Sequence, residues 1–183
     1  MRVAYADPPY PGMSGFYADH PDYAGEIDHA LLLKQLDTEY DGWLLHTAST
    51  TLREVFRCAD RAEIDSFRVM AWCKSFAAFK KNVCPAYAWE PVLVKPCRKP
   101  TVDHRIVMRD WIVEGITLQR GLVGAKPEDV CRWGFEMLGL GPDDELIDLF
   151  PGTGAVTRAW ERWRNELRLP LEAGPDAFVS DAV

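Results

Sequence analysis

The sequence predicts an α/β fold in which a mostly parallel β-sheet carries helices on both faces. Two patterns predict it. Short, near-continuous apolar runs alternate along the chain with segments of helical spacing. Runs such as Trp43-Leu44-Leu45 lack the polar alternation of a half-exposed strand, and this is typical of parallel strands buried on both faces. The chain has 183 residues, 48% of them hydrophobic, which fits one domain with a sizeable core.

The first half of the chain alternates strands and helices around one long loop. The first strand must end at Pro8-Pro9, because proline has no N–H with which to continue a ladder. The loop that follows is rich in Pro, Gly, Asp and Tyr, and long loops in compact domains are more often functional than idle. The expected segments are a strand at 2–7, the loop at 8–25, a helix at 27–40, a strand at 43–47 and a helix from 49–51 to 59.

The second half contains a less regular region between two pairs of elements. Pro127 suits the first turn of a helix, and Gly139 and Gly141 suit its end. Residues 170–183 show little periodicity, and we expect this tail to be partly disordered. The expected segments are strands at 67–73 and 87–94, an irregular basic region at 95–125 with extended pieces near 106–108 and 112–116, a helix at 126–138, a strand at 145–150 and a helix at 155–167.

Composition excludes several classes of protein. No apolar run approaches the roughly 20 residues of a membrane span, and residues 1–7 lack the apolar core of a secretory signal. Histidines are scattered, and no pair of cysteines has metal-binding spacing, so we expect no bound metal. An odd number of widely spaced cysteines also argues against a disulfide scaffold and predicts a cytoplasmic protein: Cys58, Cys73, Cys84, Cys97 and Cys131.

Basic residues gather in one window of an otherwise acidic chain. The net charge is −7, yet residues 74–109 contain eight basic and two acidic residues, a net charge of +6 against −13 for the rest. Such a stripe could follow a phosphate backbone, and it could equally be a solvated loop region. The residues expected to contact nucleic acid are Lys74, Lys80, Lys81, Arg98 and Lys99.

Asp7-Pro8-Pro9-Tyr10 is the first segment with a chemical interpretation. Because the prolines end the ladder, nearby carbonyl oxygens stay free to accept hydrogen bonds. Asp7 and the carbonyl of Pro8 could then accept from one –NH₂ group, while Tyr10 lies flat against a planar ring. The segment therefore fits an amino group on a heteroaromatic base, although a purely structural turn is the commoner use of such a sequence.

The second segment with a chemical interpretation is Asp148-Leu149-Phe150-Pro151-Gly152-Thr153-Gly154. Gly152 and Gly154 permit positive φ and close approach of the backbone to a ligand, and the helix that follows offers free N–H groups. In open α/β sheets, ligands bind at the carboxyl ends of strands, where both segments are expected to lie. A plain strand-to-helix connection would also explain the glycines.

Together the two segments resemble the S-adenosylmethionine-dependent amino-methyltransferase family, whose members methylate exocyclic nitrogens of adenine or cytosine. The Asp-Pro-Pro-Tyr motif precedes the Phe-x-Gly-x-Gly turn here, as in the permuted group of that family. Residues 72–74, 88–91 and 163–166 are similar to the branch of mRNA adenosine methyltransferases, which usually carries Trp where this chain has Tyr10. The resemblance implies a Rossmann-like methyltransferase domain at 1–169, with 95–125 as a short basic insert.

The resemblance also implies a role for each matching residue. Asp7, Pro8, Pro9 and Tyr10 would form the catalytic motif, with Asp7 where methyl donor and base meet. The cofactor, S-adenosylmethionine, would lie against Asp7, Lys126, Asp148, Phe150, Gly152, Thr153, Gly154 and Asn165. Lys126 would approach its carboxylate, and Asn165 its ribose.

These residues lead to one main hypothesis and several alternatives. The main hypothesis is methylation of adenine N6 in DNA, and the alternatives are cytosine N4 in DNA and adenine N6 in RNA. Region 95–125 is short for a target-recognition domain, so specificity could depend on a homodimer or a partner subunit. A different class of protein, an inert methyltransferase-like partner, is disfavoured by the intact Asp7-Pro8-Pro9-Tyr10 motif.

Overall fold

The computed structural model describes residues 1–12, 14–17, 25–78, 84, 86–99, 108–116 and 125–169. β1 (Arg2–Ala6) lies inside the sheet, parallel to β2 (Gly42–His46) on one side and to β6 (Glu145–Asp148) on the other. β1 is fully buried from Val3 onward, and β2 is buried throughout, which accounts for their continuous apolar sequences.

The other half of the sheet is formed largely by antiparallel pairs. β4 (Tyr87–Lys95) runs antiparallel to β2 and to β3 (Arg68–Ala78), and β5 (Trp111–Val113) runs parallel to β3. The strand order is β5-β3-β4-β2-β1-β6. Five of the six described strands thus run in the same direction and only β4 is reversed, so the expected mostly parallel sheet is confirmed. β3 and β4 pair antiparallel because the segment 79–86 between them is too short for the crossover that a parallel pair needs.

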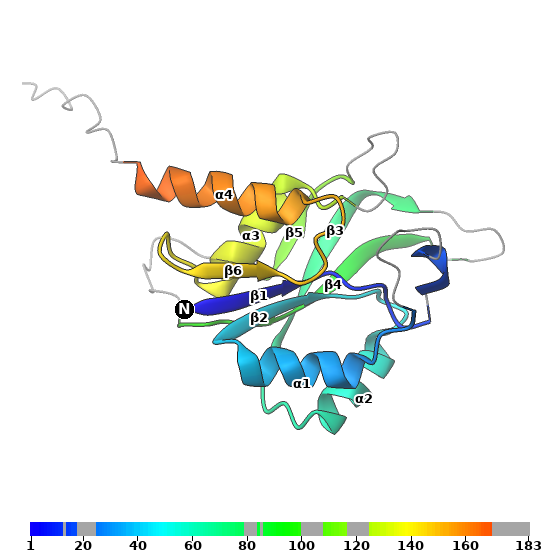
Figure 1. The fold of residues 1–183 in the computed structure, drawn as a ribbon. Helices are drawn as coiled ribbons and strands as arrows, with labels where there is room; N and C mark the ends of the chain where they lie inside the picture. Colours follow the sequence, from blue (N-terminus) through cyan, green and yellow to red (C-terminus); the bar gives the residue numbers. More distant parts are fainter. Residues whose placement is uncertain are drawn as a thin grey trace, which may run out of the picture.

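The helices form two layers, one on each face of the sheet (Figure 1). α1 (His29–Glu39) and α2 (Leu52–Arg61) share a core with Ala4, Ala6 and Leu45. α3 (Glu128–Leu138) and α4 (Ala155–Arg168) share the opposite core with Val3, Tyr5 and Leu44. Alternate residues of each strand thus supply the two cores, as the period of two requires. A short 3-10 helix, η1 (Ser14–Tyr17), lies in the loop after β1.

Local sequence signals set the helix boundaries. The carboxylate of Asp28 accepts hydrogen bonds from the backbone N–H groups of Ala30 and Leu31, at 2.9 and 3.0 Å, and so caps α1. Gly139, with φ of 73°, ends α3 in the left-handed conformation that glycine adopts without strain. The boundaries expected from the sequence agree with the structure to within a few residues, except that β3 continues to Ala78, beyond the end expected at Cys73. Of the two extended pieces expected in 95–125, the one near 112–116 overlaps β5.

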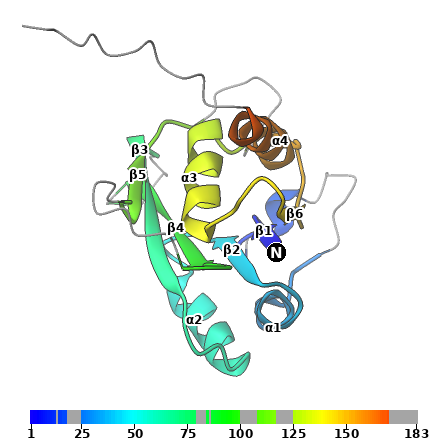
Figure 2. The same cartoon turned by 90° about the vertical axis from the view of Figure 1, so that its left-hand side faces the viewer.

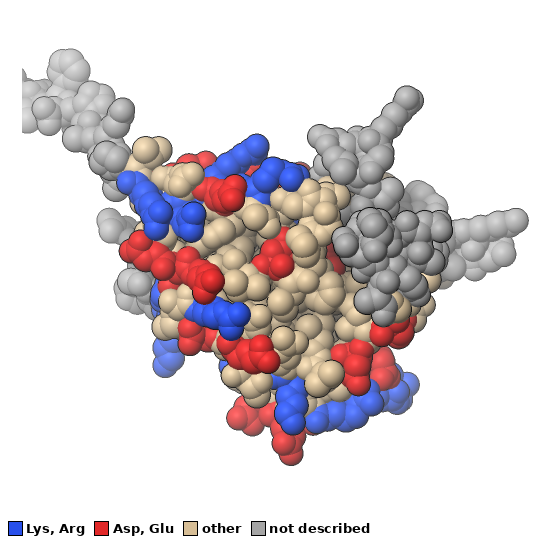
Figure 3. All heavy atoms as spheres, in the orientation of Figure 1, with Lys and Arg blue, Asp and Glu red and all other residues tan. Residues whose placement is uncertain are grey.

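Charge is mixed over the face shown in Figure 3, where lysines and arginines alternate with acidic residues over α1 and α4. None of the helices in the described part of the chain is long and apolar enough to cross a membrane. The tail at 170–183, residues 106 and 107 of the extended piece expected near 106–108, and about half of the basic insert lie outside the described residues.

Candidate active site

The carboxyl ends of β1, β2 and β6 meet at one edge of the sheet, because these three strands are parallel neighbours. Asp7 follows β1, and the glycine turn at 151–154 follows β6. The N–H of Leu149 donates to the carbonyl of Tyr5 at 3.0 Å and continues the pairing up to this edge. The two segments singled out in the sequence therefore lie beside each other.

Asp7 is bound to Lys126 in a largely buried ion pair. The distance from Asp7 Oδ1 to Lys126 Nζ is 3.0 Å, and 21% of the Asp7 side chain remains exposed. Pro8 is buried, while Pro9 and Tyr10 are partly buried. Burial, with Asp7 and Glu90 nearby, raises the pKa of Tyr10 well above its ordinary value, so its hydroxyl stays neutral. Asp7 thus keeps part of its carboxylate open at the edge where the glycine turn ends.

Lys126 joins Asp7 to a second carboxylate, Glu90. Its Nζ lies 3.0 Å from Glu90 Oε1, and both side chains are 7% exposed. Burial alone lowers the pKa of Lys126, but the oxygens of Asp7, Tyr10 and Glu90 outweigh it and hold the pKa well above its ordinary value. Burial likewise opposes ionisation of Glu90, yet Lys126, His46 and Lys74 hold its pKa well below the usual range. Both groups are therefore charged at neutral pH.

The network continues inward through His46 and Glu90, which sequence reasoning did not select, and through Lys74, which it expected to contact nucleic acid. Glu90 accepts from His46 Nδ1 at 2.9 Å and from Lys74 Nζ at 3.1 Å, and His46 Nε2 is 2.7 Å from the Tyr5 hydroxyl. Glu90 and His46 come from strands β4 and β2 and are buried. The available signal was Glu90 itself, a carboxylate before the apolar run 91–94, which needs a cation when buried.

An ammonium group, not a metal ion, neutralises these acids. Asp7, His46 and Glu90 bring ligand atoms within 4.8 Å of one another, a spacing that would suit a cation. Lys126 Nζ contacts the carboxylates of both Asp7 and Glu90, so the positive charge that the cluster requires is already in place. We therefore assign no metal to this cluster of described residues.

The glycine turn has the conformation that its sequence predicts. Gly152 and Gly154 have φ values of 44° and 72°, and Gly154 precedes the first turn of α4. The guanidinium of Arg158 donates to the carbonyl of Thr153 at 2.9 Å and stabilises the turn from the helix side. Phe150 is partly buried against the α1–α2 core. The glycine turn and the start of α4 therefore lie at the same edge of the sheet as Asp7.

Asp148, the last residue of β6, has a carboxylate that is only partly satisfied. Its Oδ2 accepts from the Thr157 hydroxyl at 3.1 Å, whereas its buried Oδ1 has no hydrogen-bond partner within the described chain. Burial raises the pKa of Asp148, although Thr157 opposes this shift. An unpaired buried oxygen is costly, and a ligand that donates to it would remove the cost.

Three of the predicted site residues lie elsewhere. Asn165 is exposed near the far end of α4, roughly 16 Å along the helix axis from the glycine turn at 1.5 Å per residue, so the structure does not bring it to the site. The guanidinium of Arg98 binds the Asp144 carboxylate at 2.6 and 2.8 Å, beside Met1 at the opposite edge of the sheet, and Lys99 follows it. Lys80 and Lys81 lie outside the described residues.

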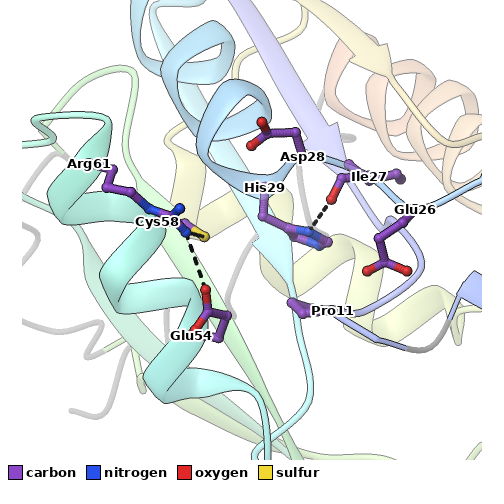
Figure 4. A pocket seen from close by; sticks show the side chains of 8 residues that line it. All are labelled: Pro11, Glu26, Ile27, Asp28, His29, Glu54, Cys58 and Arg61. Atoms are coloured by element: carbon purple, nitrogen blue, oxygen red, sulfur yellow. Dashed lines mark hydrogen bonds and ion pairs between the residues drawn. The ribbon is translucent and has the colours of Figure 1, made fainter.

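A separate cavity of about 430 Å³ lies between α1 and α2, next to Pro11 (Figure 4). His29 lies in its wall and donates from Nδ1 to the carbonyl of Ile27 at 2.9 Å, while its buried Nε2 has no partner among the residues that the structure describes. The cavity includes none of the residues of the Asp7–Lys126–Glu90 cluster. It is therefore distinct from the candidate active site.

Comparison with known proteins identifies the fold class. No protein-family model and no curated protein matches the sequence. Among solved structures, the M1.HpyAVI–SAM complex is similar, with a TM-score of 0.55 and 15% identity over 89% of this chain and 78% of that chain. M1.HpyAVI itself gives a TM-score of 0.48 and 14% identity, over 88% and 76%. The likeness to the complex confirms the expected Rossmann-like methyltransferase fold.

Proposed function

We propose that the protein transfers a methyl group from S-adenosylmethionine to the exocyclic amine of a nucleic-acid base, adenine N6 in DNA. The observation that carries this proposal is the position of Asp7-Pro8 directly beside the glycine turn at 151–154, on neighbouring parallel strands. Residues 1–169 would form the methyltransferase domain. The absence of disulfides among the five cysteines, all within the described residues, supports a reducing location such as the cytoplasm.

The donor set fits the amino-acid part of this cofactor. The unpartnered Oδ1 of Asp148 would accept from its ammonium group, and Lys126 would donate to its carboxylate. Gly152 and Gly154 would allow close approach of the turn backbone, with Thr153 and Phe150 alongside. The cofactor supplies a methyl group on a positively charged sulfur. Asn165 is not part of this set, because of its distance along α4.

The catalytic contribution of the protein would be orientation and hydrogen bonding. An aryl amine is a poor nucleophile because its lone pair is delocalised into the ring. Asp7 and the carbonyl of Pro8 would accept hydrogen bonds from its two N–H groups and so favour a tetrahedral nitrogen with a localised lone pair. The nitrogen would gain the methyl group as the C–S bond of the cofactor breaks and leaves a neutral thioether, and Asp7 would take the proton that the nitrogen loses. Tyr10, neutral and partly buried, would stack against the base.

DNA and adenine are the parts of this proposal that need direct measurement, because cytosine N4 and RNA adenine fit the same acceptors. The protein would be incubated with labelled cofactor and with separate DNA and RNA pools, and the nucleosides would be resolved by mass spectrometry. We expect N6-methyladenine in the DNA pool. Calorimetric titration with S-adenosylmethionine tests the inert-partner alternative, since such a protein would show no cofactor binding.

A further inference from the structure

One part of the sheet has no helix on its surface. α1 and α2 cover β1, β2 and the end of β4 around Leu93. α3 packs against the other face of β3 and β5, at Met70 and Ile112, so within the described chain no helix covers these two strands on the side of α1 and α2. In Figure 2, β3 and β5 form the outer side of the molecule, away from α1 and α4. A sheet face without a covering layer normally carries polar residues, so its composition is informative.

The strand register shows which residues share this uncovered face. Trp89 pairs with Cys73, which pairs with Val113, and the next row consists of Pro91, Ala71 and Trp111. Residues directly opposite each other project to the same side of a sheet, so these six lie on one surface with Val69. Its largest side chains remain open to solvent: Val69 37%, Trp89 40%, Trp111 43% and Val113 55%. We call this surface the β3–β5 face.

The β3–β5 face reaches the candidate active site. Consecutive strand residues point to opposite faces, so Trp89 lies on the β3–β5 face while its neighbour Glu90 joins Lys126 and Asp7 on the other side. Val113 and Cys73 extend the same row outward from this edge. A strand of nucleic acid with one base at Asp7 could therefore cross the edge and continue over Trp89.

The chemistry of the face favours stacking on unpaired bases. The exposed guanidinium of Arg109 lies 5.1 Å from the centre of the Trp111 ring, a cation–π arrangement that also offers donors to phosphate. Arg109 belongs to the basic window 74–109, which includes the end of β3 and all of β4. Aromatic rings beside cations are the usual means of holding single strands without sequence preference.

We propose that the β3–β5 face is a stacking platform for single-stranded nucleic acid, on which bases next to the target lie against Trp89 and Trp111. This rests on the proposed function, and it specifies that function further: the substrate is a single strand, or a duplex opened around the target. Stacking on the platform would offset part of the cost of separating the target from its neighbours.

The test measures binding of fluorescently labelled single-stranded and duplex oligonucleotides by anisotropy, without cofactor, at fixed salt. Trp89→Ala and Trp111→Ala should each weaken single-strand binding by roughly 5- to 100-fold. Trp89→Phe and Trp111→Phe keep a planar ring and should retain most of the affinity. Leu31→Ala is the matched control, because Leu31 is 66% exposed on α1, away from the face, and it should bind like the wild type.

A second measurement does not depend on how the alanine variants fold. A single strand should quench the tryptophan fluorescence of the wild type, and the Trp89→Phe/Trp111→Phe double variant should lose most of that quenching. Unchanged affinity in both alanine variants, or equal binding of duplex and single strand, would overturn the platform. The platform would also be overturned if the alanine substitutions changed the sedimentation coefficient of the free protein but left its affinity for nucleic acid unchanged. That result would show that the β3–β5 face binds another copy of the protein.

The proposed function is judged separately, by methyl transfer with the wild type. If the wild type methylates nucleic acid while the alanine variants bind as tightly as it does, the platform fails and the function remains. If the wild type neither binds nor methylates nucleic acid, the proposed function fails, and the platform fails with it.

Discussion

At the scale of single residues, the candidate site depends on the way Lys126 divides its charge between two acids. Its ammonium lies 3.0 Å from oxygens of both Asp7 and Glu90 in an environment that is nearly closed to water. The two acids differ in their other partners. Glu90 is also bound by His46 and Lys74, whereas Asp7 is partly exposed at the edge. Asp7 is therefore suited to contact substrate, and Glu90 to position Lys126.

Asp7→Ala should abolish methyl transfer while leaving most of the cofactor affinity. The variant removes an acceptor for the amine but keeps Lys126 paired with Glu90, so the cation that would hold the cofactor stays in place. We expect kcat to fall by about 100-fold or more, as when one preorganised group is lost from a catalytic site. Single-turnover transfer and calorimetric cofactor titration measure the two effects. Wild-type turnover in this variant would disprove the assignment of Asp7.

Glu90→Gln should destabilise the protein in a pH-dependent way. Loss of the carboxylate leaves Asp7 as the one carboxylate bound to Lys126 within the described site. The free energy of unfolding should therefore drop by about 3 kcal/mol. The pKa of Glu90 is lower in the folded state than in the unfolded state. Its contribution to the free energy of unfolding is therefore complete when the pH is above the unfolded pKa, about 4.3, and is lost as the pH falls through the folded pKa.

Urea unfolding of the wild type and Glu90→Gln at several pH values checks this prediction. The difference between the two proteins should be constant from about pH 5 to pH 9, where Lys126 also stays charged, and should narrow below about pH 4. A difference that does not depend on pH would mean that Glu90 acts by packing and not by charge.

The sequence revealed the residues at loop ends but not the buried network behind them. Asp7 and Gly154 could be predicted because prolines and glycines alter the backbone in ways that are visible locally. His46 and Glu90 are 44 residues apart, and only the antiparallel pairing of β2 with β4 brings them together. Asn165 was carried over from a family motif, and the length of α4 separates it from the site.

At the scale of elements, the turn between β6 and α4 requires glycine for its backbone conformation. Gly154 has a φ of 72°, and a Cβ there would meet the Arg158 guanidinium at 3.0 Å, the movable end of a flexible side chain. The main cost of a side chain at this position is thus the left-handed φ, about 1–2 kcal/mol. Gly25, with a φ of 87° and open space around it, carries the same backbone cost away from the turn.

Gly154→Ala and Gly25→Ala should therefore have similar effects on stability and different effects on cofactor binding. Both should lower the free energy of unfolding by about 1–2 kcal/mol. Only Gly154→Ala should weaken binding of S-adenosylmethionine, by about tenfold or more, which corresponds to about 1.4 kcal/mol. Equal cofactor affinity in the two variants, measured by calorimetry, would show that the turn does not approach the cofactor.

The boundaries of the elements were easier to predict than their arrangement. The polar residues and glycines around α1 and α3 fix the ends of these helices locally, as Asp28 and Gly139 show. The direction of β4 and the place of β5 beside β3 depend on contacts between distant segments, for which apolar periodicity gives no information. The sheet is mostly parallel, as expected, but the reversed direction of β4 could not be predicted.

At the scale of the whole molecule, one edge of the sheet carries the candidate active site and the other carries contacts that stabilise the fold. Asp7, Lys126 and the glycine turn lie at the carboxyl edge of β1 and β6. At the other edge, Asp144 binds both Arg98 and the terminal amine of Met1, and Arg98 also donates to the carbonyl of Gly139 at 2.7 Å. These contacts fasten the start of β6 to α3 and β1, far from the proposed chemistry.

Lys74→Ala, at the carboxyl edge, and Arg98→Ala, at the amino edge, should differ in their effects on nucleic-acid binding. Lys74, 24% exposed beside Glu90, should contribute one phosphate contact, so its loss should weaken nucleic-acid binding and reduce the slope of log K against log salt by about one. Arg98→Ala should leave both quantities unchanged and should lower stability by about 1–2 kcal/mol, because the guanidinium is 40% exposed and partly screened. Anisotropy titrations at several salt concentrations, together with urea unfolding, measure all of these quantities. If Arg98→Ala reduces the salt slope as much as Lys74→Ala does, nucleic acid reaches the amino edge and the division between the edges is wrong.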